Sequence, residues 1–172
     1  MDLKRRVIGK GVLAAAVALA FAGAAHADDV IRIGVLATLE GPFAAGGQDG
    51  IRGAELALKQ KNGMAGGHKI EFVKGSSNAT PDKAVGATRK LVEQDKVQIM
   101  IGPLSGDEGI AVKNYSKSQP GVTFINGSSG AQATTLVDPS ANFFRFHTEG
   151  AQWMVGLGEH ALAKGYKKMY LI

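Results

Sequence analysis

The residues of this chain that could do chemistry gather in two short polar stretches. Ser105-Gly106 precedes one predicted helix, and Ser128-Ser129-Gly130 precedes another that starts at Ala131. Serine hydroxyls and free backbone N–H groups at a helix N-terminus bind anions. Two such sets of donors, brought together, would hold a small carboxylate. Helix capping alone would explain the same serines equally well, so the two explanations stay open.

Nucleophilic catalysis is not indicated. The stretch Gly127-Ser128-Ser129-Gly130 lacks the G-x-S-x-G pattern of a nucleophile elbow. His147 follows a short predicted strand and His160 lies on a helix flank, and nothing places either ring beside a serine. We therefore expect a protein that is not an enzyme.

Metal and nucleotide sites are not indicated either. The chain has no Cys and four His, and the adjacent acids Asp107-Glu108 would point apart on a helix. Glu108 instead suits the first turn of a helix, where the helix dipole favours acids. The run Gly46-Gly47-Gln48-Asp49-Gly50 lacks both G-x-G-x-x-G and G-x-x-x-x-G-K-[ST]. We expect no metal and no cofactor.

The composition is that of a globular chain: 45% of the 172 residues are hydrophobic and 20% are charged. The formal charge of +5 depends on the N-terminus, because residues 1–27 hold four of the 20 basic and one of the 15 acidic residues. The remainder has 16 basic and 14 acidic residues, or +2. That balance, without a basic run, argues against a nucleic-acid partner.

The N-terminus reads as an export signal over residues 1–27. A basic segment, an apolar run from Gly11 to Gly23 and the tripeptide Ala25-His26-Ala27 follow one another. The apolar run is shorter than the roughly 20 residues that span a bilayer. We expect cleavage after Ala27 and a periplasmic protein, a compartment that a chain without Cys tolerates.

The rest of the chain alternates strand and helix patterns, which predicts an α/β fold with a mostly parallel sheet flanked by helices. Ligands of such sheets bind at the carboxyl ends of the strands. Three polar, Gly-containing loops are expected there, side by side if successive strands are neighbours: residues 39–50, 102–109 and 126–130. The predicted strands cover residues 30–37, 69–74, 97–101, 122–125, 142–146 and 168–172, and the predicted helices begin near Ile51, Pro81, Ile110 and Thr148.

The pattern makes a further prediction for the helix from Ile51 and another for the last residues of the chain. The apolar stripe of the first helix starts at Ile51, so residues 38–50 are expected to form a loop. The helix after Thr148 would bury Trp153, Met154, Leu157 and Ala161. A last strand at residues 168–172 with nothing after it is an odd end for a domain. We therefore expect a truncated chain, or one lobe of a longer protein.

Five segments, taken in order, resemble the type I periplasmic solute-binding proteins, and within them the leucine/isoleucine/valine-binding branch that serves ABC importers. The segments are IRIGVLATLEGPF from Ile31, GIRGAELA from Gly50, RKLVEQD from Arg89, IGPLS from Ile101 and FRF from Phe144. The resemblance runs from about Ile31 to Ile172. It implies a Rossmann-like first lobe at residues 28–147, left incomplete, and the start of a second lobe at residues 148–172.

The same resemblance implies a function and a site. An extracytoplasmic protein would capture a small polar ligand between two lobes, most simply a branched-chain or other amino acid, and deliver it as a monomer to an ABC permease. An alternative is a sensing module of the same fold for an amide, urea or aromatic acid. Gly106 and Gly130 stand where amino-acid binders usually carry hydroxyls. The implied ligand contacts are Ser105, Gly106, Gly127, Ser128, Ser129, Gly130, Phe43 and Gly46.

Overall fold

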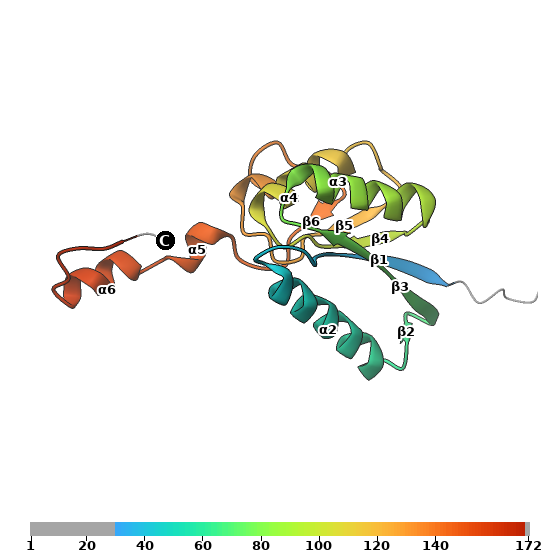
Figure 1. Ribbon diagram of the computed structural model, residues 1–172, viewed down its shortest axis with the longest axis horizontal. Helices are drawn as coiled ribbons and strands as arrows, with labels where there is room; N and C mark the ends of the chain where they lie inside the picture. The colour runs from blue at the N-terminus through green and yellow to red at the C-terminus, as the bar shows by residue number, and fades with distance from the viewer. Residues whose placement is uncertain (1–29, 171–172) are drawn as a thin grey trace, which may run out of the picture.

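The computed structural model describes residues 30–170, so the predicted export signal at residues 1–27 lies outside the described residues. One sheet of six strands has the order β2-β3-β1-β4-β5-β6 (Figure 1). Five of its strands run parallel, as the alternating pattern predicts, and only β2 pairs antiparallel, with β3. The strands are β1 (Ile31–Thr38), β2 (Met64–Ala65), β3 (His68–Ser77), β4 (Ile99–Ile101), β5 (Thr123–Ile125) and β6 (Phe143–Phe144).

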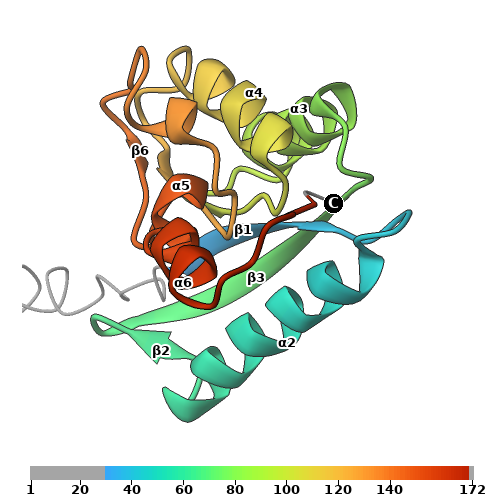
Figure 2. The ribbon, with the colours of Figure 1, turned by 90° about the vertical axis from the view of Figure 1, so that its left-hand side faces the viewer.

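The helices connect these strands and cover both faces of the sheet near β1. Helix α2 lies on one face, and α3 and α4 lie together on the other (Figures 1 and 2). The longer helices are α2 (Ala44–Gln60), α3 (Pro81–Arg89) with a π-helical end at Lys90–Gln94, and α4 (Gly106–Ser116). The shorter ones are a 3-10 turn at Gln132–Thr134, α5 (Gly150–Trp153) and α6 (Leu157–Ala163). Among the described residues no helix is long and apolar enough to cross a membrane.

The sheet extends in both directions from β1, because the next long strand, β3, pairs on one side of it and β4 pairs on the other. The chain builds outward from β1 through α2 to β3, then crosses back through α3 to β4 and continues to β5. Such a reversal leaves a crevice beyond the carboxyl ends of the two central strands, because the loops that leave them part in opposite directions. The loops after β1 and β4 flank that crevice.

Two apolar clusters hold the sheet to its helices. The larger lies under α3 and α4, where Leu91, Met100 and Phe124 are all at most 2% exposed. The smaller lies under α2, where Ile51 packs with Val35 and Ala37. Side chains alternate between the two faces along β1, so Leu36 joins the first cluster while its neighbours join the second.

Helix α2 begins at Ala44, seven residues before the predicted start at Ile51. The prediction of a loop over residues 38–50 is therefore wrong for its second half. The reason is a close approach of backbones: a Cβ on Gly47 would lie 1.8 Å from the carbonyl oxygen of Thr38. The glycine at position 47 allows α2 to lie against the end of β1. This close packing outweighs the poor helix propensity of glycine.

The C-terminal segment also differs from the prediction. Instead of one helix with a buried face, α5 and α6 are separated by Gly156, whose φ of +82° breaks the helix. Of the four residues expected to be buried, only Ala161 is; Trp153, Met154 and Leu157 are between 46% and 58% exposed. Residues 168–170 form no strand, and residues 171–172 lie outside the described part. In Figure 1 this segment projects away from the sheet, so no neighbouring strand or helix covers it.

Candidate functional site

The three loops expected at the site do meet at one edge of the sheet, because they follow the adjacent parallel strands β1, β4 and β5. The loops after β4 and β5 are joined directly. The N–H of Ser128 donates to the carbonyl of Pro103 at 3.2 Å. A Cβ on Gly127 would lie 2.7 Å from that same carbonyl oxygen, so the two loops touch through their backbones.

Ser105 is the N-cap of α4 and forms a capping box with Glu108. Its hydroxyl accepts a hydrogen bond from the Glu108 N–H at 3.4 Å and donates to the carbonyl of Ala79 at 3.4 Å. Glu108 therefore lies in the first turn of a helix, as predicted. The Ser105 hydroxyl is committed to these two backbone groups, which supports the capping explanation for this serine.

The capping box decides which amides of α4 remain available. It satisfies the N–H of Ser105 and of Glu108. In the described part of the chain, no hydrogen bond occupies the N–H of Gly106 or of Asp107. These two amides lie at the positive end of the helix dipole and at the crevice edge, so they are the donors that suit an anionic ligand.

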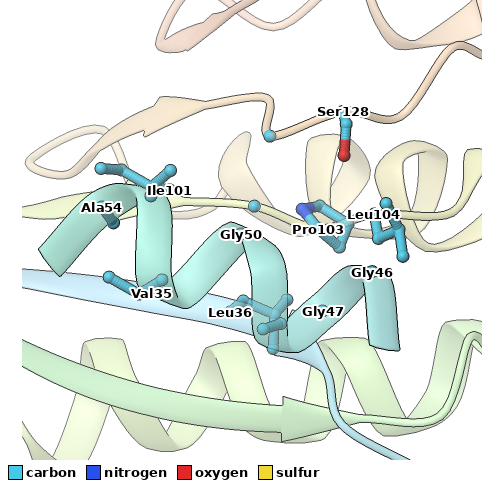
Figure 3. Close-up of a pocket in the computed structure, with 14 residues that line it drawn as sticks. Val35, Leu36, Gly46, Gly47, Gly50, Ala54, Ile101, Pro103, Leu104 and Ser128 are labelled. Atoms are coloured by element: carbon cyan, nitrogen blue, oxygen red, sulfur yellow. The ribbon is translucent and has the colours of Figure 1, made fainter. Parts of the chain in front are cut away.

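Ser128 and Ser129 are adjacent but have opposite environments. Ser128 is exposed, and Figure 3 shows its hydroxyl directed toward a groove beside α2. Ser129 is fully buried, and its side chain occupies the space where a Cβ of Gly109 would lie, 2.2 Å from the Ser129 Oγ. Of the two hydroxyls, only that of Ser128 is open to an incoming ligand without a rearrangement of the loop.

Behind the loop after β5, buried polar atoms lack partners within the described chain. The Asn126 Nδ2 donates to the carbonyl of Ser129 at 2.8 Å, but the Asn126 Oδ1 and the Ser129 Oγ have no hydrogen-bond partner. Unpaired buried polar atoms are costly and normally find a water molecule or a ligand. This loop therefore has hydrogen-bonding capacity to spare.

An aromatic pair covers Gly130. The indole of Trp153 lies so close that a Cβ on Gly130 would be 2.6 Å from its Cη2. The same indole stacks on the His147 ring, with 6.5 Å between centroids and 27° between planes. The carbonyl of Gly130 accepts from the Gly150 N–H at 2.7 Å, which fixes the start of α5 against the loop. A glycine at position 130 is what allows the indole to lie here.

Phe43 and Gly46 belong to the start of α2. Phe43 is its N-cap residue and is 52% exposed, and it is not among the residues that line the groove beside α2. Gly46 lines the groove beside α2, where a Cβ would lie 3.4 Å from the Leu104 side chain. The structure thus brings Gly46, Gly127 and Ser128 to one groove.

This groove has a volume of about 450 Å³ and an apolar lining (Figure 3). Small residues of α2, Gly50 and Ala54 among them, form one wall, and Ile101 and Leu104 form the other. Ser128 contributes the only side-chain hydroxyl of that lining among the described residues. A groove of this kind suits an apolar group, whereas the free amides of α4 suit the charged end of a ligand.

Two residues near the site were not assigned by the sequence analysis. Arg145, the centre of the FRF segment, donates from Nη1 to the carbonyl of Ala131 at 3.2 Å, which places a cation beside the loop after β5. Glu108 was assigned only to a helix turn, yet it is fully buried. The spacing Ser105-x-x-Glu108 is a capping-box signature, and could have indicated their contact. Among residues 30–170, no group of three or more His, Cys, Asp or Glu is placed to hold a metal ion.

A family model described as periplasmic binding protein matches residues 30–172. The chain belongs to the periplasmic binding protein family. Its relatives include Leu/Ile/Val-binding protein homolog 7 of Brucella suis, 33% identical over 131 residues and 75% of this chain. The Leu/Ile/Val-binding protein of Escherichia coli is 33% identical over 128 residues and 67% of this chain. The match covers 32% and 34% of those two proteins, so the chain spans about a third of the curated relatives it matches.

Solved structures of the family agree with the fold. An ABC transporter substrate-binding protein from Sphaerobacter thermophilus has a TM-score of 0.70 at 31% identity, covering 80% of this chain and 38% of that one. A solute-binding protein from R. palustris, in complex with benzoate, has a TM-score of 0.73 at 27% identity, covering 79% and 38%. A branched-chain amino acid transporter protein from Streptococcus pneumoniae, in complex with isoleucine, has a TM-score of 0.63 at 27% identity, covering 70% and 34%.

These comparisons confirm the resemblance to the leucine/isoleucine/valine-binding branch and the α/β fold of a type I periplasmic binding protein. Two solved structures with the same 27% identity to this chain are complexes with different small molecules. Isoleucine occupies one and benzoate another. Both ligands carry one carboxylate and an apolar group, and isoleucine carries an α-ammonium group as well.

Proposed function

We propose that this chain is the N-terminal portion of an exported solute-binding protein that captures a small carboxylate for an ABC importer. The family match carries the proposal. It is supported by two free amides at the start of α4 and by an exposed Ser128 on the neighbouring loop. The carboxylate would bind these donors, and a second lobe beginning near residue 148 would close over it. Closure needs a ligand that contacts the closed state better than the open one.

The projection of α5 and α6 from the sheet supports a lobe boundary near residue 147. Export through a signal at residues 1–27 and release as a periplasmic monomer complete the proposal. Mass spectrometry of the exported protein would test the first of these: a mature chain starting at Asp28 is expected, and an uncleaved N-terminus would contradict it.

The leading ligand is a branched-chain amino acid, in keeping with the Leu/Ile/Val-binding relatives. An aromatic acid is the second candidate, and one observation favours it. The Trp153 indole covers Gly130 at the loop edge and is 56% exposed, so an aromatic side chain lies within reach of a planar ligand at this loop. Aromatic acids occupy structurally similar proteins. The same binding would also serve a sensor that is not coupled to transport.

Isothermal titration calorimetry of the full-length mature protein, which includes the proposed second lobe, with L-leucine, L-isoleucine and 4-hydroxybenzoate tests the proposal. Ser128→Ala should weaken binding of the active compound about tenfold, since a lost hydrogen bond to a charged group costs roughly 1.5 kcal/mol or more. Ser118→Ala is the control, because that hydroxyl caps the far end of α4 by donating to the carbonyl of Tyr115. Equal affinities for parent and Ser128→Ala would remove Ser128 from the site.

A further inference from the structure

Glu108 is a buried acid that the proposed binding step does not use. Its side chain has no exposure to solvent, although it lies in the first turn of α4, beside the crevice. It takes part in none of the ion pairs formed within the described part of the chain. A buried acid without a cation is expensive and persists only where hydrogen bonds compensate it.

Three hydrogen-bond donors from three different segments compensate the cost of burying the Glu108 carboxylate. Its Oε1 accepts from the Ala79 N–H at 3.0 Å. Its Oε2 accepts from the Thr38 hydroxyl at 3.1 Å and from the Ser105 N–H at 3.2 Å. Thr38 ends β1, Ala79 lies in the turn after β3, and Ser105 follows β4. One carboxylate thus ties together the carboxyl ends of the three central strands.

The chemistry of these donors requires a carboxylate. The Ala79 and Ser105 amides can only donate, and each approaches a different oxygen. A glutamine has one carbonyl oxygen and one NH₂ group, so either orientation would set that NH₂ against a backbone N–H. Only an acceptor on both sides satisfies the two amides, and Asp would be one methylene too short to reach from α4.

The capping box extends this contact to the free amides. By accepting from the Ser105 N–H, the Glu108 carboxylate fixes the residue that precedes Gly106, and the Ser105 hydroxyl in turn accepts from the Glu108 N–H. The same hydroxyl donates to the Ala79 carbonyl, which closes a ring between the two loops. The direction of the Gly106 and Asp107 amides therefore depends on the Glu108 carboxylate.

We propose that Glu108 is the positioning residue of the binding edge, by which we mean the loops after β1, β3 and β4 at the carboxyl ends of these strands. Its buried carboxylate sets the relative placement of the three loops, and with it the direction of the two free amides of α4. Glu108 itself does not touch the ligand. The part of this inference that concerns ligand affinity rests on the proposed function, whereas the part that concerns the loops does not.

Amide hydrogen exchange, followed by NMR, tests the loops without any ligand. Glu108→Gln should speed the exchange of at least one of the Ala79 and Ser105 amides tenfold or more, beyond the change in global stability. The reason is that a glutamine offers an acceptor to only one of the two amides. Ser116→Ala is the matched control: it removes a buried hydroxyl that donates to the Lys113 carbonyl at the other end of α4. Exchange in Glu108→Gln no faster than in Ser116→Ala would overturn the proposal.

Calorimetry with 4-hydroxybenzoate and with L-leucine gives the second readout. Glu108→Gln should weaken the compound that binds the parent by about tenfold or more, while Ser116→Ala stays within about twofold. Equal losses in both variants would reduce Glu108 to a stabilising residue and overturn the proposal. If neither compound binds the parent, the proposed ligands fail, and the exchange experiment alone decides on Glu108.

A milder variant covers the case in which Glu108→Gln does not fold. Thr38→Val removes one donor to the carboxylate and keeps the shape of the buried side chain. It should speed exchange at Ala79 and Ser105 by a smaller factor, about threefold, since the two backbone donors remain. Unchanged exchange at both amides in Thr38→Val would count against the positioning role.

Discussion

Tyr115 is a partly buried side chain whose pKa is raised by its surroundings in the folded protein. Its ring packs edge-on against Phe124, with 6.4 Å between centroids and 80° between planes. Its hydroxyl donates to the Glu93 Oε1 at 3.1 Å. Burial, followed by the hydrogen bond to Glu93 and its negative charge, raises the pKa of Tyr115 to about 12.

This shift predicts a pH dependence. The unfolded chain would ionise Tyr115 near its ordinary pKa of 10.0, and the folded protein only near 12. The folded state holds the proton more tightly, so the contribution to stability is complete below pH 10 and is lost as the pH rises toward about 12. Phenolate absorbance should show one of the three tyrosines ionising last, and earlier in Glu93→Gln. A single transition near pH 10 for all three would contradict the assignment.

Gly130 and Trp153 give a second prediction at this scale. In Gly130→Ala the new methyl group would lie 2.6 Å from the indole, so Trp153 must move off His147. Because Trp153 is the sole tryptophan, its emission intensity reports the change directly. Gly121→Ala is the control, since a Cβ there meets nothing within 4 Å. Identical emission from parent and Gly130→Ala would mean that the indole does not lie on this glycine.

At the scale of residues, the sequence predicted which loops meet at this edge of the sheet but could not distinguish their serines. Ser105 precedes a helix, and its position in the sequence is compatible with a capping role as well as with ligand binding. Ser128 and Ser129 look equivalent in the sequence, yet one is exposed and the other is buried against Gly109. The difference depends on the path of the loop across α4, which is a tertiary contact that no local pattern encodes.

Among the elements, α2 has the tightest contact with the sheet. Gly47→Ala would bring a Cβ to 1.8 Å from the Thr38 carbonyl oxygen, so helix and strand must separate. Overpacking of this kind costs about 1–3 kcal/mol or more. Gly53→Ala, one and a half turns further on, meets nothing within 4 Å and should stabilise the helix by about 0.5–1 kcal/mol. Urea unfolding of both variants measures the difference.

The order of the two unfolding free energies tests the close contact between α2 and β1. A Gly47→Ala variant as stable as Gly53→Ala would show that α2 does not approach β1 so closely. Thr38 also donates to Glu108, so any separation of α2 from Thr38 should disturb the binding edge as well. The two substitutions thus distinguish helix propensity from packing within one helix.

At the scale of elements, the alternation of strands and helices predicted the parallel sheet and the edge where its loops meet. The two-stranded hairpin of β2 and β3 was missed, because two residues of strand leave no periodic pattern. The start of α2 was misplaced, because glycines suggested a loop where close packing requires them. Helix boundaries set by tertiary contacts lie beyond local propensity.

The molecule as a whole leaves part of its sheet uncovered. Helices α3 and α4 cover one face, whereas α2 covers the other only near β1 (Figures 1 and 2). Since Phe143 is buried beneath α4, its neighbour Phe144 must point to the opposite face, where it is 46% exposed. In the sheet Phe144 is next to Ile125 of β5, and Ile125 is next to Ile101 of β4, which lines the apolar groove.

We therefore expect the chain from Asp28 to bind a hydrophobic dye such as ANS while it is folded. Phe144→Ser should reduce the dye fluorescence, because it removes apolar surface from the open face. Leu56→Ser, an exposed position on α2, is the control for a general loss of hydrophobicity. No dye binding by the folded parent would show that another part of the chain covers this face.

At this scale the sequence predicted the family and the α/β fold correctly, but not the conformation of the C-terminal segment. A helical face with Trp153, Met154 and Leu157 was expected to be buried, yet all three side chains are about half exposed, although the Trp153 indole contacts Gly130 and His147. The pattern of apolar residues identifies which face of a helix seeks a partner, and it does not tell whether that partner lies in the same stretch of chain.

The central position of β1 has a practical consequence for binding measurements. This strand enters the sheet at Ile31, and its carboxyl end reaches the loop edge, so a linker joined before Ile31 lies at the opposite rim. A sensor surface that holds the protein by this end would present the free amides of α4 and Ser128 outward. Immobilisation through an exposed lysine such as Lys83 of α3 would instead hold the protein by its side. Attachment at the amino end is therefore the orientation in which capture of a solute can be followed without obstruction.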